Sequence, residues 1–186
     1  NQFKIGDLGA LIHEHINYFS YKSACKLFQL CGFHIENVIK ANDEITVLCR
    51  KNEEQNISNE INCNAPLINI LETTRLMESK LDFNKKLVEQ KLSEGKNVAF
   101  HGACNALSNF LYISQLNQRN DYYIFDGDKS KQDRYLPFSS VPILFCNDPK
   151  YNEIDYLFIA SSTFSTQIRD HAVSKLGNEF VIDLFA

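Results

Sequence analysis

The sequence predicts an α/β fold in which a Rossmann-like domain with a parallel sheet follows a helix and an antiparallel hairpin. Short apolar stretches alternate with helical stretches over residues 95–186, and this alternation favours right-handed βαβ units and a parallel sheet. Two strand-like stretches, residues 33–41 and 44–51, flank Asn42-Asp43. Asn-Asp is suited to a tight turn, so these stretches are expected to form the hairpin.

The hairpin is preceded by a short amphipathic helix. Ser20 is of the type that helices prefer as an N-cap, and Gly32 supplies the stop that ends many helices. Between them apolar residues recur at three- and four-residue spacing: Tyr21, Ala24, Cys25, Phe28 and Cys31. Residues 1–51 are therefore predicted to form one region made of a loop, a helix and an antiparallel hairpin.

A polar connection and a long helix are expected next, over residues 52–94. The stretch NEEQNISNEINCNAP is rich in Asn, Glu and Ser and ends in Pro66, which indicates an exposed linker. Apolar residues from Leu67 to Ser93 then fall on one helical face, with Gly95 at the end. This pattern favours a core helix over a cofactor box or a coiled-coil seam.

The Rossmann-like domain is expected to span residues 95–186. A glycine and an acidic residue stand at the carboxyl ends of the apolar stretches that we expect to be strands. The expected strands are residues 97–101, 122–126, 156–160 and 180–184, and the expected helices are residues 105–115 and 163–176.

Composition and charge argue against several kinds of partner. The 186 residues carry a net charge of −4 and no long basic run, which indicates no nucleic-acid partner. No apolar run approaches the ~20 residues that span a bilayer, and the first ten residues lack a signal-peptide pattern, so we expect no membrane partner and a cytoplasmic protein. The six cysteines form no CxxC pair and are expected to be reduced.

The stretch IHEHINYFS, residues 12–20, concentrates groups suited to acid–base chemistry. In an extended segment His13 and His15 point to one face and Glu14 to the other. Zinc needs at least a third protein ligand, and no spacing ties another histidine to this pair, so no metal is predicted. Spacing alone leaves two interpretations open: a general base beside a carboxylate, or a polar turn before the helix cap.

A second group of candidate residues follows the strands of the Rossmann-like domain. Gly102 comes directly after the first of these strands, and Asp126 ends the next, where dinucleotide sites keep their ribose acid. The turn GACNAL holds one glycine where that fingerprint has three, so NAD binding is only a weak third hypothesis. Lys129, Lys131 and Arg134 are expected to face either a phosphate or solvent.

The order of these motifs resembles the sugar C-methyltransferase family, which uses S-adenosylmethionine to methylate nucleotide-linked keto-sugars. The shared order is HEHxxYFS, a helix, GF, a hairpin, a long helix and GK-V-A-x-x-GA, and the resemblance covers essentially the whole chain. Further matches in order and spacing are Phe125-Asp126, Lys131-Gln132 and Val141-Pro142-Ile143. The resemblance implies that residues 1–51 are the last elements of a class I methyltransferase domain, its terminal helix and antiparallel hairpin.

The resemblance also implies roles for individual residues. His15 occupies the position of the base that removes the proton alpha to the sugar ketone, with Glu14 and His13 beside it. Such a base is chemically required, because methylation at carbon needs a carbanion or an enolate. Ile12 stands where the family has a tyrosine. The residues that we expect to bind substrate are Tyr18, Gly102, Asn105 and Asp126.

The implied cofactor is S-adenosylmethionine, bound by a part of the polypeptide outside this chain. No strand that ends in an acidic, glycine-rich turn precedes His13, so the chain is expected to be inactive alone. The expected partners are a small-molecule nucleotide-sugar substrate and the rest of the same polypeptide. The alternative is a non-catalytic Rossmann-like module that binds a nucleotide or a nucleotide sugar.

Overall fold

The computed structural model describes residues 8, 19–41, 44–51 and 70–185. These residues fall into two compact units. Residues 19–51 belong to one, called the hairpin unit, and Leu8 with residues 70–185 belongs to the other, called the parallel-sheet unit. Each unit is described by itself.

The hairpin unit begins with helix α2 (Tyr21–Leu30), whose ends are those that the sequence predicted. Ser20 and Ser23 form a reciprocal capping box: the Ser23 amide donates to Ser20 Oγ at 3.2 Å, and the Ser20 amide donates to Ser23 Oγ at 2.8 Å. Gly32 has a φ of +80°, the left-handed conformation that glycine adopts without strain after a helix. The predicted cap and stop are therefore confirmed.

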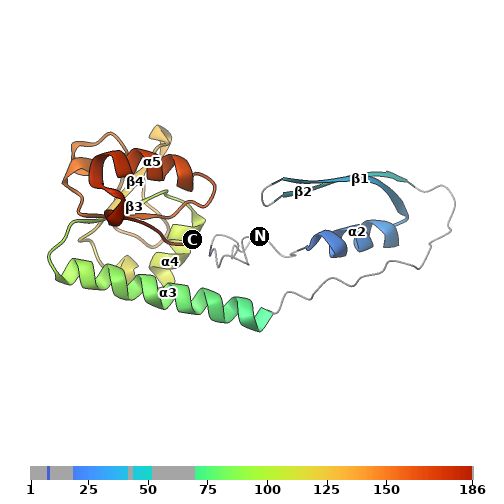
Figure 1. The fold of residues 1–186 in the computed structure, drawn as a ribbon, viewed down its shortest axis with the longest axis horizontal. Helices are drawn as coiled ribbons and strands as arrows, with labels where there is room; N and C mark the ends of the chain where they lie inside the picture. Colours follow the sequence, from blue (N-terminus) through green and yellow to red (C-terminus); the bar gives the residue numbers. More distant parts are fainter. Residues whose placement is uncertain (1–7, 9–18, 42–43, 52–69, 186) are drawn as a thin grey trace. The chain divides into compact units, whose positions relative to one another are not determined.

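Strands β1 (Phe33–Ala41) and β2 (Glu44–Lys51) form the predicted antiparallel hairpin. One bulge interrupts the register between Ile35 and Asn37. Helix α2 packs on the hairpin (Figure 1). The rings of Phe28 and Phe33 are in edge contact, with their centroids 6.2 Å apart. The turn at Asn42-Asp43 lies outside the described residues.

The parallel-sheet unit contains five strands in the order β5-β4-β3-β6-β7, and all neighbouring pairs are parallel. This sheet confirms the predicted Rossmann-like architecture. Strand β5 was not among the expected strands. The strands are β3 (Val98–His101), β4 (Tyr123–Asp126), β5 (Ile143–Phe145), β6 (Tyr156–Ile159) and β7 (Val181–Asp183).

Helices cover both faces of this sheet (Figure 1). Helices α3 (Ile70–Ser93) and α4 (Asn105–Ile113) contribute to one buried cluster, and α5 (Ser165–Leu176) contributes to the other. Four short 3₁₀ helices lie in the described connections: Leu116–Gln118, Lys129–Lys131, Pro149–Glu153 and Asn178–Phe180.

The central strand β3 is buried along its whole length, and its side chains alternate between the two clusters. Phe100 lies in the cluster with α3 and α4, where its ring is 5.4 Å from Tyr122 and 5.7 Å from Phe158. Ala99 belongs to the cluster with α5. Burial on both faces explains why the strands read as continuous apolar runs.

Candidate functional site

The candidate site lies at the carboxyl edge of the parallel sheet. Strand β3 leads into α4 on one face, and its neighbour β6 leads into α5 on the other. Neighbouring strands whose helices leave on opposite faces define a topological switch point, where open α/β sheets bind their ligands. The turns after β3 and β6 are therefore the candidate substrate-binding region.

Gly102 brings these two turns into direct contact. Its φ of +108° is a conformation that residues with side chains rarely adopt, and its amide donates to the carbonyl of Phe125 at 2.9 Å. A Cβ at Gly102 would lie 3.0 Å from Ser161 Cβ and 3.1 Å from the Ser161 amide nitrogen. The turns after β3 and β6 thus pack closely against each other at Gly102 and Ser161.

Asp126, at the end of β4, holds the turn after β3 in place. Its Oδ2 accepts a hydrogen bond from the Ala103 amide at 2.7 Å, and its Oδ1 accepts one from the Asp128 amide at 2.8 Å. The residue is only 8% exposed. The carboxylate is therefore fixed by backbone amides on both of its oxygens.

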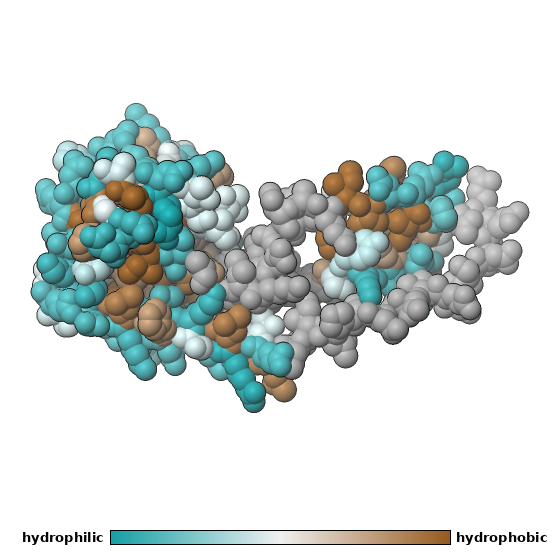
Figure 2. All heavy atoms as spheres, in the orientation of Figure 1, coloured by the Kyte–Doolittle hydropathy of each residue, from teal (hydrophilic) through white to brown (hydrophobic). Residues whose placement is uncertain are grey.

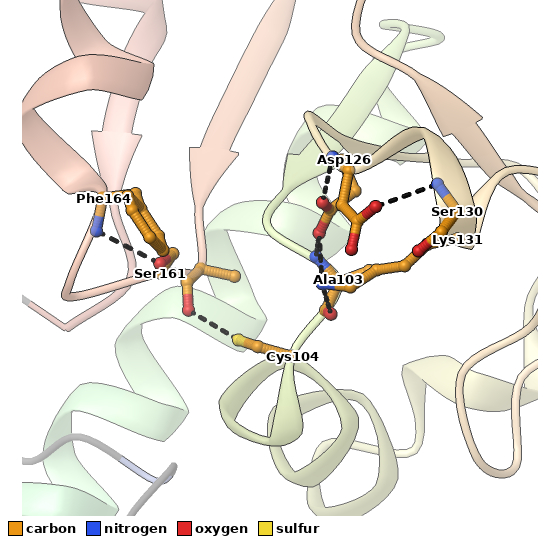
Figure 3. Close-up of polar contacts among 9 residues, drawn as sticks. Ala103, Cys104, Asp126, Ser130, Lys131, Ser161 and Phe164 are labelled. Carbon is orange, nitrogen blue, oxygen red and sulfur yellow. Dashed lines mark hydrogen bonds and ion pairs between the residues drawn. The ribbon is translucent and has the colours of Figure 1, made fainter.

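Lys131 completes this arrangement (Figure 3). Its Nζ lies 3.0 Å from Asp126 Oδ2 and 3.0 Å from the carbonyl oxygen of Ala103. The sequence suggested that Lys131 faces a phosphate or solvent. Its side chain is 38% exposed, and its ammonium group bridges the β4 acid and the β3 turn. The 3₁₀ helix Lys129–Lys131, which Asp128 caps through the Ser130 amide, directs this side chain inward.

The first residues of α4 lie beside this ion pair. Asn105 is exposed at the first position of the helix, and the thiol of Cys104 donates to the carbonyl of Ala160 at 3.2 Å, which links the turns after β3 and β6. The structure thus brings Gly102, Asn105 and Asp126 to one edge of the sheet. Their roles in substrate binding stay predictions.

The other predicted site residues lie outside the described residues: His13, Glu14, His15 and Tyr18. The structure therefore gives no geometry for the candidate base. Within the part of the chain that the structure does describe, no three His, Cys, Asp or Glu side chains group as a metal site. In that same part, no helix combines the length and apolar character needed to cross a membrane.

A buried polar pair that sequence reasoning missed lies below the switch point. His101 Nδ1, at the end of β3, is 3.0 Å from the hydroxyl oxygen of Tyr151 and shares a hydrogen bond with it. Burial lowers the pKa of His101 to about 4; the charge of Asp126 opposes this shift and that of His171 adds to it. Burial raises the pKa of Tyr151. Both groups are thus neutral and structural at pH 7.

Protonation of His101 should destabilise the parallel-sheet unit in acid. Its pKa is lower in the folded state than the ordinary value of 6.5, so the unfolded state binds the proton more tightly. The stabilisation is complete above pH 6.5 and is lost as the pH falls to about 4, in total about 3 kcal/mol. We expect urea unfolding at a series of pH values to show this fall in the free energy of unfolding. His101→Gln should make the fall smaller.

The matched control is His34→Gln, which replaces an exposed histidine on β1. In this variant the free energy of unfolding should depend on pH as it does in the original protein. If His101→Gln left the pH dependence of the free energy of unfolding unchanged, another group would be the one that takes up the proton. His171 is such a group, because burial lowers its pKa as well.

The carboxyl edge departs in two details from the usual Rossmann site for a dinucleotide or S-adenosylmethionine. A ribose diol binds to acceptor oxygens on the acid after the second strand. Asp126 already accepts from Ala103, Asp128 and Lys131, which leaves about one further acceptor site on its carboxylate. The turn after β3 also packs closely against Ser161 at the base of the switch point.

Fold and site together define a Rossmann-like α/β domain whose turn after β3 is held by the ion pair of Asp126 and Lys131. A model of the family described as C-methyltransferase C-terminal domain matches residues 41–184. Because this match covers more than half of the chain, the chain belongs to that family and is a portion of a C-methyltransferase. The resemblance inferred from the order of the motifs is thereby confirmed. The comparison with curated proteins finds no match.

Proposed function

We propose that the chain is the C-terminal portion of a cytoplasmic, S-adenosylmethionine-dependent C-methyltransferase that acts on a nucleotide-linked keto-sugar. The observation that carries this proposal is the family match over residues 41–184. The HEH motif at residues 13–15, upstream of the matched residues, is proposed to add the acid–base group that such a reaction needs. The methyl donor is proposed to bind to another part of the polypeptide, as the resemblance to the family implies.

His15 is the proposed general base. It takes the proton from the carbon next to the sugar ketone; the electron pair of that C–H bond becomes the new C=C bond, and the carbonyl oxygen takes the negative charge. The resulting enolate carbon is the nucleophile that a C-methylation requires. S-adenosylmethionine, when bound, supplies an electrophilic methyl group on a sulfonium ion.

The parallel-sheet unit is proposed to shape the substrate side of the active site. Asn105 is exposed at the start of α4, where helix amide groups favour an anionic group such as a diphosphate. Asp126 and Gly102 are proposed to set the conformation of the turn after β3. Asp126 accepts a hydrogen bond from the Ala103 amide, and Gly102 permits the close contact with Ser161.

The hairpin unit supports the proposal that a larger domain precedes the Rossmann-like domain. Figure 2 shows hydrophobic residues gathered on its visible face, and on the hairpin strands Ile39 is 57% exposed and Leu48 is 58% exposed. A two-stranded sheet is marginally stable by itself. Both properties are expected of strands that end the larger sheet of a class I methyltransferase domain.

The test is the exchange of the alpha proton in the complete polypeptide. A nucleotide-linked keto-sugar is incubated with the enzyme in D2O without S-adenosylmethionine, and mass spectrometry follows the uptake of one deuterium. We expect exchange without the donor and a gain of one methyl group with it. Binding of the nucleotide sugar with neither exchange nor methylation would establish the alternative, a non-catalytic binding module. An absence of binding would reject both.

A further inference from the structure

The side chain of Phe164 is exposed in the turn between β6 and α5. It is 58% exposed, whereas three residues of the preceding strand are almost completely buried: Leu157, Phe158 and Ile159. Isolated exposed apolar residues are common on protein surfaces, so exposure alone marks no site. Phe164, however, lies at the carboxyl edge of the parallel sheet, in one of the two turns that form the switch point.

Phe164 also occupies the N-cap position of α5, where it makes a poor cap. Its carbonyl accepts from the Ile168 amide at 3.0 Å, but its side chain makes no capping hydrogen bond. Helices prefer Ser, Thr, Asn or Asp at this position, because a side-chain oxygen accepts from the free amides of the first turn. In the stretch SSTFST, residues 161–166, every residue but Phe164 carries a hydroxyl group. A residue that breaks such a local rule is expected at functional sites.

The turn that carries Phe164 is fixed against the turn after β3. The Phe164 amide donates to Ser161 Oγ at 3.3 Å, and Ser161 packs against Gly102. The thiol of Cys104 donates to the carbonyl of Ala160 at 3.2 Å and links the same two turns. In Figure 3, Ser161 is drawn between Phe164 and the turn after β3. The ring is therefore attached to a fixed piece of backbone beside the candidate substrate-binding region.

An aromatic ring in this place suits the base of a nucleotide. Every base has a π-face, so stacking on an aromatic side chain contributes to binding without hydrogen-bond partners on the base. Asn105, which is proposed to meet the diphosphate, follows Gly102 by three residues, and Phe164 follows Ser161 by three. Each Cα therefore lies within about 11 Å of the contact between the two turns. A nucleotide bound across this contact would have its diphosphate at α4 and its base at α5.

We propose that Phe164 is a substrate-binding residue whose ring stacks on the base of the nucleotide-linked substrate. This inference rests on the proposed function. The ring favours a sugar that carries a nucleotide over the same sugar without one, and it takes no part in proton or methyl transfer. A non-catalytic module that binds a nucleotide sugar would use Phe164 in the same way.

The experiment compares Phe164→Ser with the unsubstituted protein in the complete polypeptide. Isothermal titration calorimetry measures the affinity for ADP, GDP, UDP and dTDP, and scanning calorimetry measures thermal stability. We expect Phe164→Ser to bind the preferred nucleotide about five- to hundred-fold more weakly, the usual loss when a stacking ring is removed. Its thermal stability should stay equal or rise, because serine is a good N-cap. Phe164→Tyr keeps the ring and should keep the affinity.

The matched control is Phe138→Ser, which removes another exposed phenylalanine from the same unit. Phe138 is 72% exposed, and its ring centroid lies 4.9 Å from that of Tyr112, at the end of α4 opposite to Asn105. Nucleotide affinity should be unchanged in this control. Unchanged affinity in Phe164→Ser, or a loss that Phe164→Tyr does not restore, would overturn the inference and leave the proposed function intact. An unsubstituted enzyme that binds none of the four nucleotides would reject the nucleotide-linked substrate, and the inference with it.

Discussion

The Gly102→Ala variant is expected to lose about 4 kcal/mol of the free energy of unfolding of the parallel-sheet unit. Two effects add. The φ of +108° strains any residue with a Cβ, and the new Cβ would lie 3.1 Å from the Ser161 backbone nitrogen, which cannot rotate away. Backbone strain and overpacking each cost about 1–3 kcal/mol. Urea unfolding followed by circular dichroism measures the loss.

Two other glycines separate these effects. A Cβ at Gly127, at the end of β4, would meet no described atom within 4 Å, and its φ is not in the left-handed range. Gly127→Ala should therefore be nearly neutral. Gly95 has a φ of +74° with no described atom within 4 Å of an added Cβ, so Gly95→Ala reports strain alone. Equal losses at Gly95 and Gly102 would contradict the close approach of Ser161.

Local signals predicted most of the fold. The hairpin strands have the predicted bounds, because alternating apolar residues and the turn pair at 42–43 mark both ends. The ends of α2 follow from Ser20 and Gly32 in the same way. Strand β5 escaped prediction because it has three residues, Ile143–Phe145, directly after Pro142. Its assignment depends on pairing with β4, a contact that no local pattern encodes.

The candidate site was only partly predictable for a similar reason. The positions of Gly102, Asn105 and Asp126 after successive strands are a local property, and parallel strands bring their carboxyl ends to one edge. The occupation of the Asp126 carboxylate by Lys131 depends on a short 3₁₀ helix and on the path of the turn after β3. The pair of His101 and Tyr151 joins residues fifty positions apart. Tertiary contacts of this kind leave no periodic signal.

His15→Ala is expected to lower the rate of methyl transfer in the complete enzyme by about 10²- to 10⁴-fold, the usual contribution of a general base. The alanine variant keeps the segment and its neighbours but removes the group that accepts the proton. Its alpha-proton exchange in D2O should fall by the same factor, while the affinity for S-adenosylmethionine stays unchanged. Single-turnover kinetics with rapid quenching separates the chemical step from product release.

The controls are His13→Ala and Glu14→Gln, which change the same short motif. In an extended segment His13 and His15 point to one face and Glu14 to the other, so a role for Glu14 as a direct orienting partner of His15 requires a bend between them. A loss in Glu14→Gln close to that in His15→Ala would indicate such a bend, and a small loss would leave His15 as the sole proton acceptor. Full exchange in His15→Ala together with none in His13→Ala would move the base to His13, which the same face of the segment also presents.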